Sequence, residues 1–185
     1  MAVVISLLRG INVGGHHKIK MDALRDLYDS LGLRNAQTYV QSGNVVFKTR
    51  DQDLIRLGKK IEDAIERTFG FRPSVINRTP AELRRAIARN PFARRRGVEP
   101  HRLIVTFLAG LPGTEARDRA LKLKSDTEEL RMDEREFYMY FPAGMARPKL
   151  TWLTVEKVLQ TPATGRNWNT VTKLLEIADK LEASG

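Results

Sequence analysis

The stretch "TYVQSGNVVF", residues 38–47, decides the fold of the first half of the chain. Two runs of strand-forming residues flank the small polar residues Ser42-Gly43-Asn44, and this pattern predicts a hairpin. Its strands are expected over residues 36–41 and 44–49. Two strands that follow one another and pair directly are antiparallel, so antiparallel pairing is expected at this point of the sheet.

The segments on both sides of this hairpin complete a repeating unit. Apolar residues recur at three- and four-residue spacings over 21–31 and over 52–69, which predicts two amphipathic helices. The apolar run 3–8 precedes the first helix, the segment 73–77 follows the second, and both are predicted strands. The resulting order, βαββαβ, is typical of a ferredoxin-like plait.

The second half of the chain repeats this order. Further strands are predicted over 102–108, 127–132, 136–141 and 161–165, and further helices over 114–124 and 147–159. An extra helix follows each unit: one begins after the capping-box residues Thr79 and Glu82, and the other covers 168–182. The predicted fold class is therefore α+β, with two tandem ferredoxin-like (βαββαβ) plaits, each followed by an extra helix.

The stretch "NPFARRRGVEP", residues 90–100, has proline near both ends and a glycine inside. Such punctuation is typical of a connection between folded parts. The sequence therefore predicts a first domain over 1–90, a linker over 91–100 and a second domain over 101–185.

Composition excludes several classes of protein. The chain of 185 residues contains no cysteine, which excludes disulfides, thiolate catalysis and cysteine-based metal sites. No apolar run reaches the roughly 18 residues that span a bilayer. No secretory signal is recognised at the start, so a cytoplasmic protein without a membrane partner is expected.

The net charge of +10 is concentrated in one region. Residues 72–102 contain nine arginines and two glutamates. A basic stretch of this kind attracts nucleic acid or anionic small molecules, and residues 84–96, from Arg84 to Arg96, are the predicted contact. A solvated arginine-rich face is the alternative, because no known nucleic-acid motif accompanies the stretch.

The segment "GINVGGHH", residues 10–17, has the glycine spacing of a P-loop but lacks its lysine and its serine or threonine. Nucleotide hydrolysis by that chemistry is therefore excluded. Glycines also let backbone N–H groups approach an anion, or merely permit positive φ angles where a strand ends. The candidate ligand-binding residues here are Arg9, Asn12, Gly14, Gly15 and Lys18.

Two further regions carry candidate ligand-binding residues. Gln41 and Asn44 lie at the hairpin tip, where they serve recognition or only turn formation. A tight hairpin would separate this tip from the glycine-rich turn. The candidate residues therefore form either one site or two. Near the end of the chain, Arg166, Asn167 and Trp168 precede or begin a helix and either bind an anion or form a cap and a packing contact.

No residues are assigned to catalysis, a metal or a cofactor. His16 and His17 are adjacent and point apart on an extended chain, and His101 is remote in sequence, so no metal site is predicted. No carboxylate pair or serine motif typical of hydrolases is present.

Four motifs, "LLRGINVGG", "KIKM", "TYVQSGNVVF" and "GRNWNTVTKLLE", occur in this order. With them the chain resembles a bacterial family of uncharacterised proteins, domain of unknown function 1697, over about residues 3–180. The resemblance implies a fold of two ferredoxin-like plaits and supplies no catalytic residues. His17 stands where similar sequences often have Asn, and Arg147 and Pro148 precede Lys149 where they usually show Ser.

The function that these features favour is a binding module for an anionic ligand, either a nucleotide-like small molecule or a nucleic-acid backbone. Two alternatives stay open. One is a metal-free enzyme acting on a phosphorylated or anionic small molecule, and the other is a structural or protein-interaction protein.

Overall fold

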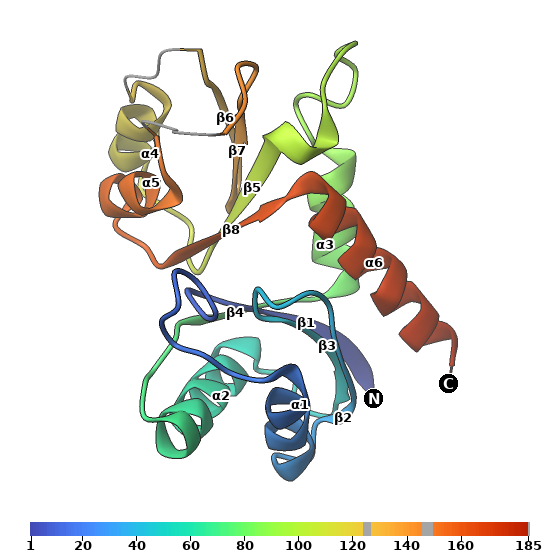
Figure 1. Cartoon of the computed structure of the whole chain (residues 1–185). Helices are drawn as coiled ribbons and strands as arrows, with labels where there is room; N and C mark the ends of the chain where they lie inside the picture. The colour runs from blue at the N-terminus through green and yellow to red at the C-terminus, as the bar shows by residue number, and fades with distance from the viewer. Residues whose placement is uncertain (124–126, 146–149, 185) are drawn as a thin grey trace. The chain divides into compact units, whose positions relative to one another are not determined.

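The computed structural model describes residues 1–123, 127–145 and 150–184. It has mixed α+β architecture, with two four-stranded antiparallel sheets and six α-helices in the described part (Figure 1). The chain divides into two compact units, Met1–Leu83 with the residues from Lys173 onward, and Arg84–Thr172. This division falls inside helices α3, Pro80–Ala88, and α6, Trp168–Ala183, whereas the predicted domain limits keep both helices whole.

The first unit contains a sheet with strand order β2-β3-β1-β4. Its elements are β1 Ala2–Leu8, α1 Met21–Ser30, β2 Arg34–Thr38, β3 Asn44–Thr49, α2 Leu54–Phe69 and β4 Val75–Arg78. Helices α1 and α2 lie on the same side of this sheet (Figure 1). Alternate residues of the strands, among them Val4, Leu8 and Phe47, are buried with the apolar residues of both helices in one core.

The predicted strand over 36–41 is wrong in position. Strand β2 ends at Thr38 and contains an irregularity in its pairing with β3, where Asn35 has a φ of 56°. Residues 39–43 then form a loop rather than a tight two-residue turn, because the register pairs Thr38 with Val45. The other predicted elements of this unit agree with the structure to within about two residues at each end.

Local signals at the helix ends act as the sequence predicts. The Thr79 hydroxyl accepts a hydrogen bond of 3.1 Å from the Glu82 N–H, and the Glu82 carboxylate accepts one of 2.8 Å from the Thr79 N–H. This reciprocal capping box fixes the start of α3. Gly70 ends α2 in the left-handed conformation, with a φ of 78°.

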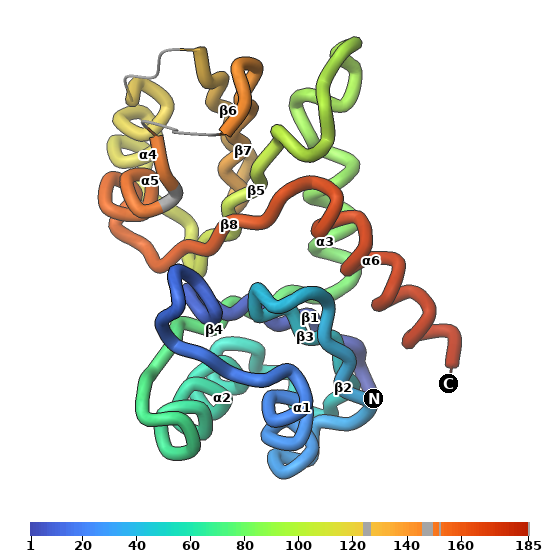
Figure 2. Tube along the Cα trace, in the orientation of Figure 1, coloured from blue at the N-terminus to red at the C-terminus, as the bar shows by residue number. Residues whose placement is uncertain are grey.

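The second unit contains a sheet with strand order β6-β7-β5-β8, whose chain path can be followed in Figure 2. Its elements are β5 Leu103–Leu108, α4 Thr114–Leu121, β6 Glu129–Asp133, β7 Glu136–Tyr140, α5 Trp152–Leu159 and β8 Ala163–Asn167. A short 3-10 helix, Pro100–Arg102, precedes β5. The predicted helix over 147–159 begins at residues that lie outside the described part. Lys149 is one of these residues.

The segment assigned to a linker packs against β7. The Phe92 side chain is only 4% exposed, and its ring lies 5.8 Å from that of Tyr140. The Tyr140 hydroxyl donates a 3.3 Å hydrogen bond to the Gly97 carbonyl, and the Arg95 guanidinium lies over the same ring. Burial of Phe92 therefore holds residues 91–100 on the second sheet.

Among the described helices, none has the length and apolar character needed to span a membrane.

Candidate functional site

The loop that follows β1 is anchored in the core at both ends. Ile11 and Ile19 are buried there, while the residues between them reach the surface. The loop is itself a small hairpin, since Asn12 N–H donates to the His17 carbonyl at 3.1 Å and His16 N–H donates to the Val13 carbonyl at 3.1 Å. We refer to residues 9–19 as the glycine loop.

Asn12 ties the glycine loop together. Its Nδ2 donates to the Ile19 carbonyl at 3.0 Å and to the Gln41 carbonyl at 2.9 Å, and its Oδ1 accepts from the Ile19 N–H at 2.9 Å. The residue has a φ of 55°, which asparagine tolerates better than most residues. One side chain thus joins both ends of the loop to the β2–β3 connection.

The hairpin tip lies beside the glycine loop, because the hairpin is not tight. The antiparallel register pairs Leu7 of β1 with Asn44 of β3, so the end of β1 meets the start of β3. The Leu8 N–H donates to the Gly43 carbonyl at 2.8 Å. The glycine loop and residues 39–43 therefore form one surface.

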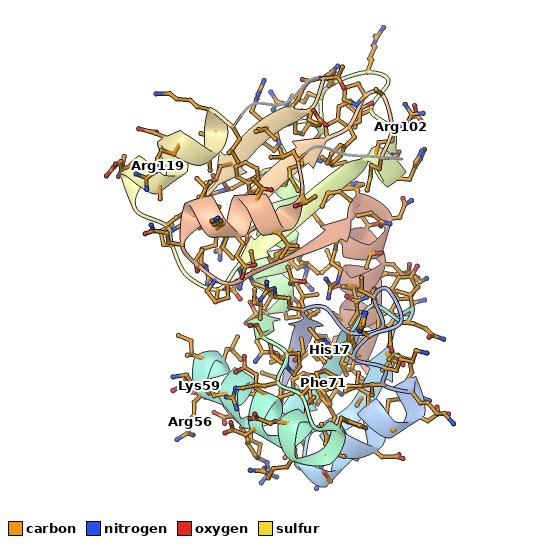
Figure 3. The ribbon with its side chains drawn as sticks, turned by 60° about the vertical axis from the view of Figure 1, so that its left-hand side comes forward. His17, Arg56, Lys59, Phe71, Arg102 and Arg119 are labelled. Carbon is orange, nitrogen blue, oxygen red and sulfur yellow. The ribbon has the colours of Figure 1, made fainter. Side chains whose placement is uncertain are left out.

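Positive φ angles gather in these two loops. Of six non-glycine residues with positive φ in the described ranges, Asn12, His17 and Val40 lie here. Val40, at 49°, is the least expected, because a β-branched side chain is strongly disfavoured in this region. His17 is held by stacking on Phe71, with ring centroids 4.4 Å apart (Figure 3), and its Nδ1 lies 3.3 Å from the Gly10 carbonyl oxygen. The local backbone is therefore held against its intrinsic preferences.

A groove of about 670 Å³ opens between the two loops and the start of α1. It is lined by Asn12, Gly15, Lys18, Ile19, Lys20, Met21, Asp22 and Gln41. Lys18 and Lys20 bring two positive charges, and the Asp22 carboxylate pairs with Arg25 on the same helix. Lys20 is the N-cap of α1, and its side chain makes no capping hydrogen bond to the first N–H groups of that helix.

Other predicted residues of these loops have structural roles. Asn44 is buried, and its Nδ2 donates to the Tyr39 carbonyl at 3.0 Å and to the Ser42 hydroxyl at 2.9 Å, which closes the β2–β3 connection. Gly14 occupies the tip of the glycine loop with a φ of 58°. Arg9 is half-buried, and its backbone N–H donates to the Ser74 carbonyl at 2.9 Å.

Arg166, Asn167 and Trp168 belong to the other compact unit. The Asn167 Oδ1 accepts a 2.8 Å hydrogen bond from the Thr170 N–H and so caps α6. Arg166 is buried, and its Nη1 donates to the Thr164 hydroxyl at 2.7 Å and to the Gly165 carbonyl at 2.8 Å. Burial lowers the pKa of Arg166 to about 10, so the guanidinium stays charged at neutral pH. Trp168 is half-buried.

The arginine stretch 84–96 is partly neutralised within the second unit. Arg89 pairs with Glu134 at 2.7 Å and with Asp133 at 3.4 Å, and Arg95 pairs with Glu129. These carboxylates raise the pKa values of both guanidinium groups above the usual value. Two of its arginines therefore already have anionic partners within the fold.

Across the described chain, no group of three or more His, Asp or Glu side chains is arranged to hold a metal ion.

These features define a two-sheet α+β protein with a lysine-flanked groove beside a glycine-rich loop. The chain belongs to the family described as "Protein of unknown function (DUF1697)", whose profile matches residues 1–138. Its fold is similar to that of the conserved bacterial protein SP0830 from Streptococcus pneumoniae, with a TM-score of 0.74 and 23% identity over 96% of this chain and 98% of that one. No curated protein matches the chain.

Four groove residues, Asn12, Gly15, Lys18 and Gln41, are among those predicted from the sequence. Ile19 and Asp22 were missed, although "KIKM" marks the place where the loop meets the first helix. The strained Val40 was also missed. The sequence carries no signal for it, because a left-handed valine follows from the surrounding structure and not from its own preference.

Proposed function

We propose that the first unit binds an anionic, nucleotide-like small molecule in the groove between the glycine loop and the β2–β3 connection. The observation that carries the proposal is the Asn12 tie, which holds Lys18, Lys20 and the Gln41 backbone around one cavity. The anion contacts the two ammonium groups and lies near the positive end of the α1 dipole. The negative charge of the Asp22 carboxylate repels an anion in the groove, and the ion pair of Asp22 with Arg25 weakens this repulsion.

Backbone strain supports the same location. Left-handed conformations of non-glycine residues cost on the order of 1–3 kcal/mol each and cluster at ligand clamps. Three such residues in two adjacent loops indicate a shape kept for a purpose other than stability. Val13 and Val40, each beside a residue that lines the groove, are 63% and 50% exposed and offer apolar contacts to a base or similar group.

A nucleic-acid backbone presents the same phosphate chemistry to Lys18 and Lys20. The arginine stretch 84–96 supports that version less, because Arg89 and Arg95 already pair with carboxylates. We therefore favour the small molecule, and retain binding of nucleic acid through residues 84–96 as the second candidate because Arg94 and Arg96 are exposed.

We further infer that the two units are duplicated ferredoxin-like plaits. The strand orders β2-β3-β1-β4 and β6-β7-β5-β8 correspond element by element. The registers also correspond: Ile5 pairs with Arg78 in one sheet and Val105 with Arg166 in the other. Each of these arginines is buried and directly precedes a helix-capping residue, Thr79 in one unit and Asn167 in the other.

The double substitution Lys18→Gln and Lys20→Gln is expected to weaken binding of adenosine monophosphate by about 10-fold or more, since two charge-assisted contacts are lost. Isothermal titration calorimetry measures the effect. Lys59→Gln, which removes one exposed charge from α2 (Figure 3), is the control and is expected to leave the affinity unchanged. Equal affinity of the double variant and the natural protein would contradict the proposal.

Val40→Asn is expected to raise the free energy of unfolding by about 1 kcal/mol, because asparagine tolerates the left-handed conformation that strains valine. Urea denaturation measures the change. Val13→Asn is the matched control, since Val13 is also exposed and lies outside the residues with positive φ. A gain of the same size in the control would show that lost surface hydrophobicity, and not relieved strain, is responsible.

A further inference from the structure

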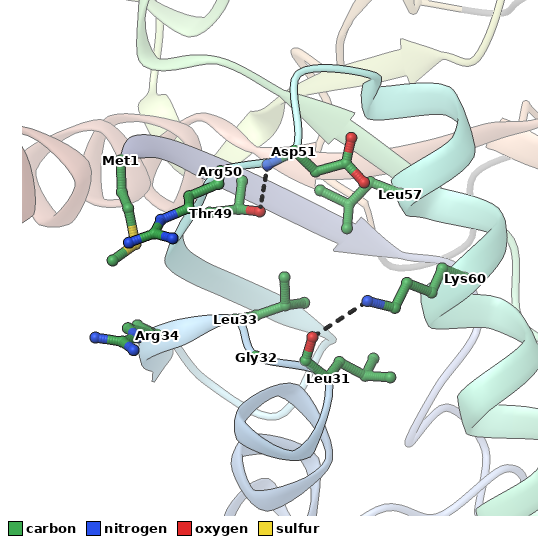
Figure 4. Close-up of a pocket in the computed structure, with 10 residues that line it drawn as sticks. All are labelled: Met1, Leu31, Gly32, Leu33, Arg34, Thr49, Arg50, Asp51, Leu57 and Lys60. Carbon is green, nitrogen blue, oxygen red and sulfur yellow. Dashed lines mark hydrogen bonds between the residues drawn. The ribbon is translucent and has the colours of Figure 1, made fainter.

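A second cavity in the first unit, of about 260 Å³, lies where β2 begins and β3 ends (Figure 4). Leu33 and Leu57 contribute buried apolar side chains to its lining. Arg34, Arg50 and Lys60 contribute positive charges. The cavity is separate in sequence and lining from the groove at the glycine loop, and its interpretation does not depend on the function proposed for that groove.

Arg34 and Arg50 are neighbours across the sheet. Arg34 pairs with Lys48 in the register of β2 and β3, and Arg50 lies two residues beyond Lys48 along the chain. Arg50 lies just beyond the end of β3, and both arginines line the cavity at this end of the sheet. Both arginine side chains extend to the same side of the cavity (Figure 4).

The charges around this cavity are not balanced by the protein. Neither the Arg34 nor the Arg50 side chain has a hydrogen-bond or ion-pair partner among the described residues. Asp51 is the one carboxylate in the lining, and it already accepts a 3.1 Å hydrogen bond from the Asp53 N–H and lies 3.6 Å from Arg56 Nη2. The Lys60 ammonium donates to the Leu31 carbonyl at 3.2 Å, at the end of α1.

We propose that Arg34 and Arg50 form an anion site for a phosphate group carried by a small phosphomonoester. Guanidinium groups bind phosphate through paired N–H donors, and two of them within reach of one cavity are suited to its several oxygens. The cavity is smaller than the roughly 300–1,000 Å³ of sites for drug-sized ligands, so it suits a ligand smaller than a nucleotide. Leu33 and Leu57 contact the carbon skeleton of the ester.

The test is a titration of the 15N-labelled full chain with inorganic phosphate and, separately, with glycerol 3-phosphate. We expect shifts of the Gly32, Leu33 and Asp51 amide signals, and tighter binding of the ester if its carbon skeleton is contacted. Equal affinities for the two probes would assign the site to free phosphate. Shifts confined to the glycine loop, or no saturable shifts with either probe, would overturn the proposal.

Substitutions distinguish specific phosphate binding by Arg34 and Arg50 from nonspecific attraction of anions to a positively charged surface. Arg34→Gln with Arg50→Gln is expected to weaken phosphate binding at these amides by more than 10-fold, and Arg34→Lys by several-fold, because lysine keeps the charge but loses the paired donors. Arg67→Gln, an exposed position on α2, is the matched control and is expected to change nothing. Equal weakening in Arg67→Gln would overturn the proposal. The Lys18 and Lys20 substitutions, which test the groove, are expected to leave these shifts intact.

Discussion

Replacing Gly43 with alanine is expected to lower the free energy of unfolding by about 2–4 kcal/mol, from overpacking together with a strained backbone. A Cβ at this position would lie 2.8 Å from the Cβ of Leu8 and 2.8 Å from Cγ1 of Ile11. Both neighbours are buried in the first core, and the Cβ of Leu8 is fixed to the backbone of β1, so neither has room to retreat. The φ of 74° adds strain for any L-residue.

Gly10 and Gly15 provide matched controls for this prediction. They have φ angles of 68° and 81°, and an added Cβ would meet no atom within 4 Å. Alanine at either position is therefore expected to cost only about 1 kcal/mol, from the backbone conformation alone. Urea denaturation of the three variants measures the difference. If Gly43→Ala costs no more than Gly10→Ala, close packing between the β2–β3 connection and β1 does not contribute.

Asn12→Ala is expected to lower the free energy of unfolding by about 2–4 kcal/mol and to abolish ligand binding in the groove. The substitution removes three hydrogen bonds, leaves the Ile19 N–H and carbonyl without these partners, and places a non-permissive residue at a φ of 55°. Thermal denaturation and calorimetry measure the two effects.

Asn35→Ala separates the hydrogen bonds from the backbone conformation. Asn35 has nearly the same φ, 56°, is exposed, and has no side-chain hydrogen bond to any described residue. Its substitution is therefore expected to cost about 1 kcal/mol, from strain alone. Equal losses at the two positions would mean that the Asn12 side chain does not hold the loops together.

Features set by neighbouring residues could be predicted from the sequence. The order of helices and strands in the described chain follows from apolar periodicity, and the capping box at Thr79 and Glu82 follows from four consecutive residues. The glycine loop was also identified as a candidate site. Of its two alternatives, the structure shows the backbone shape, since Gly14 and Gly15 have positive φ angles at the tip of the loop, and anion binding in the groove beside it is our proposal.

Features set by pairing between distant segments could not be predicted. The pattern "TYVQSGNVVF" does not encode which residue of β1 faces Asn44, so the sequence left open whether the two loops meet. The bulge in β2 shifted that strand toward the N-terminus for the same reason. Carboxylates that neutralise Arg89 and Arg95 come from β6 and the turn after it, more than 30 residues away, so the local charge count overstated the basic surface.

The irregular strand β2 has a consequence for how copies of this protein meet one another. It lies at an edge of its sheet, where free N–H and C=O groups offer a template for strands of other molecules. Its five residues, RNAQT, include a charged side chain, and the break in pairing after Arg34 bends the strand away from a regular ladder. A short, polar, kinked edge strand of this kind disfavours the addition of a strand from another molecule and so reduces aggregation through this edge of the sheet.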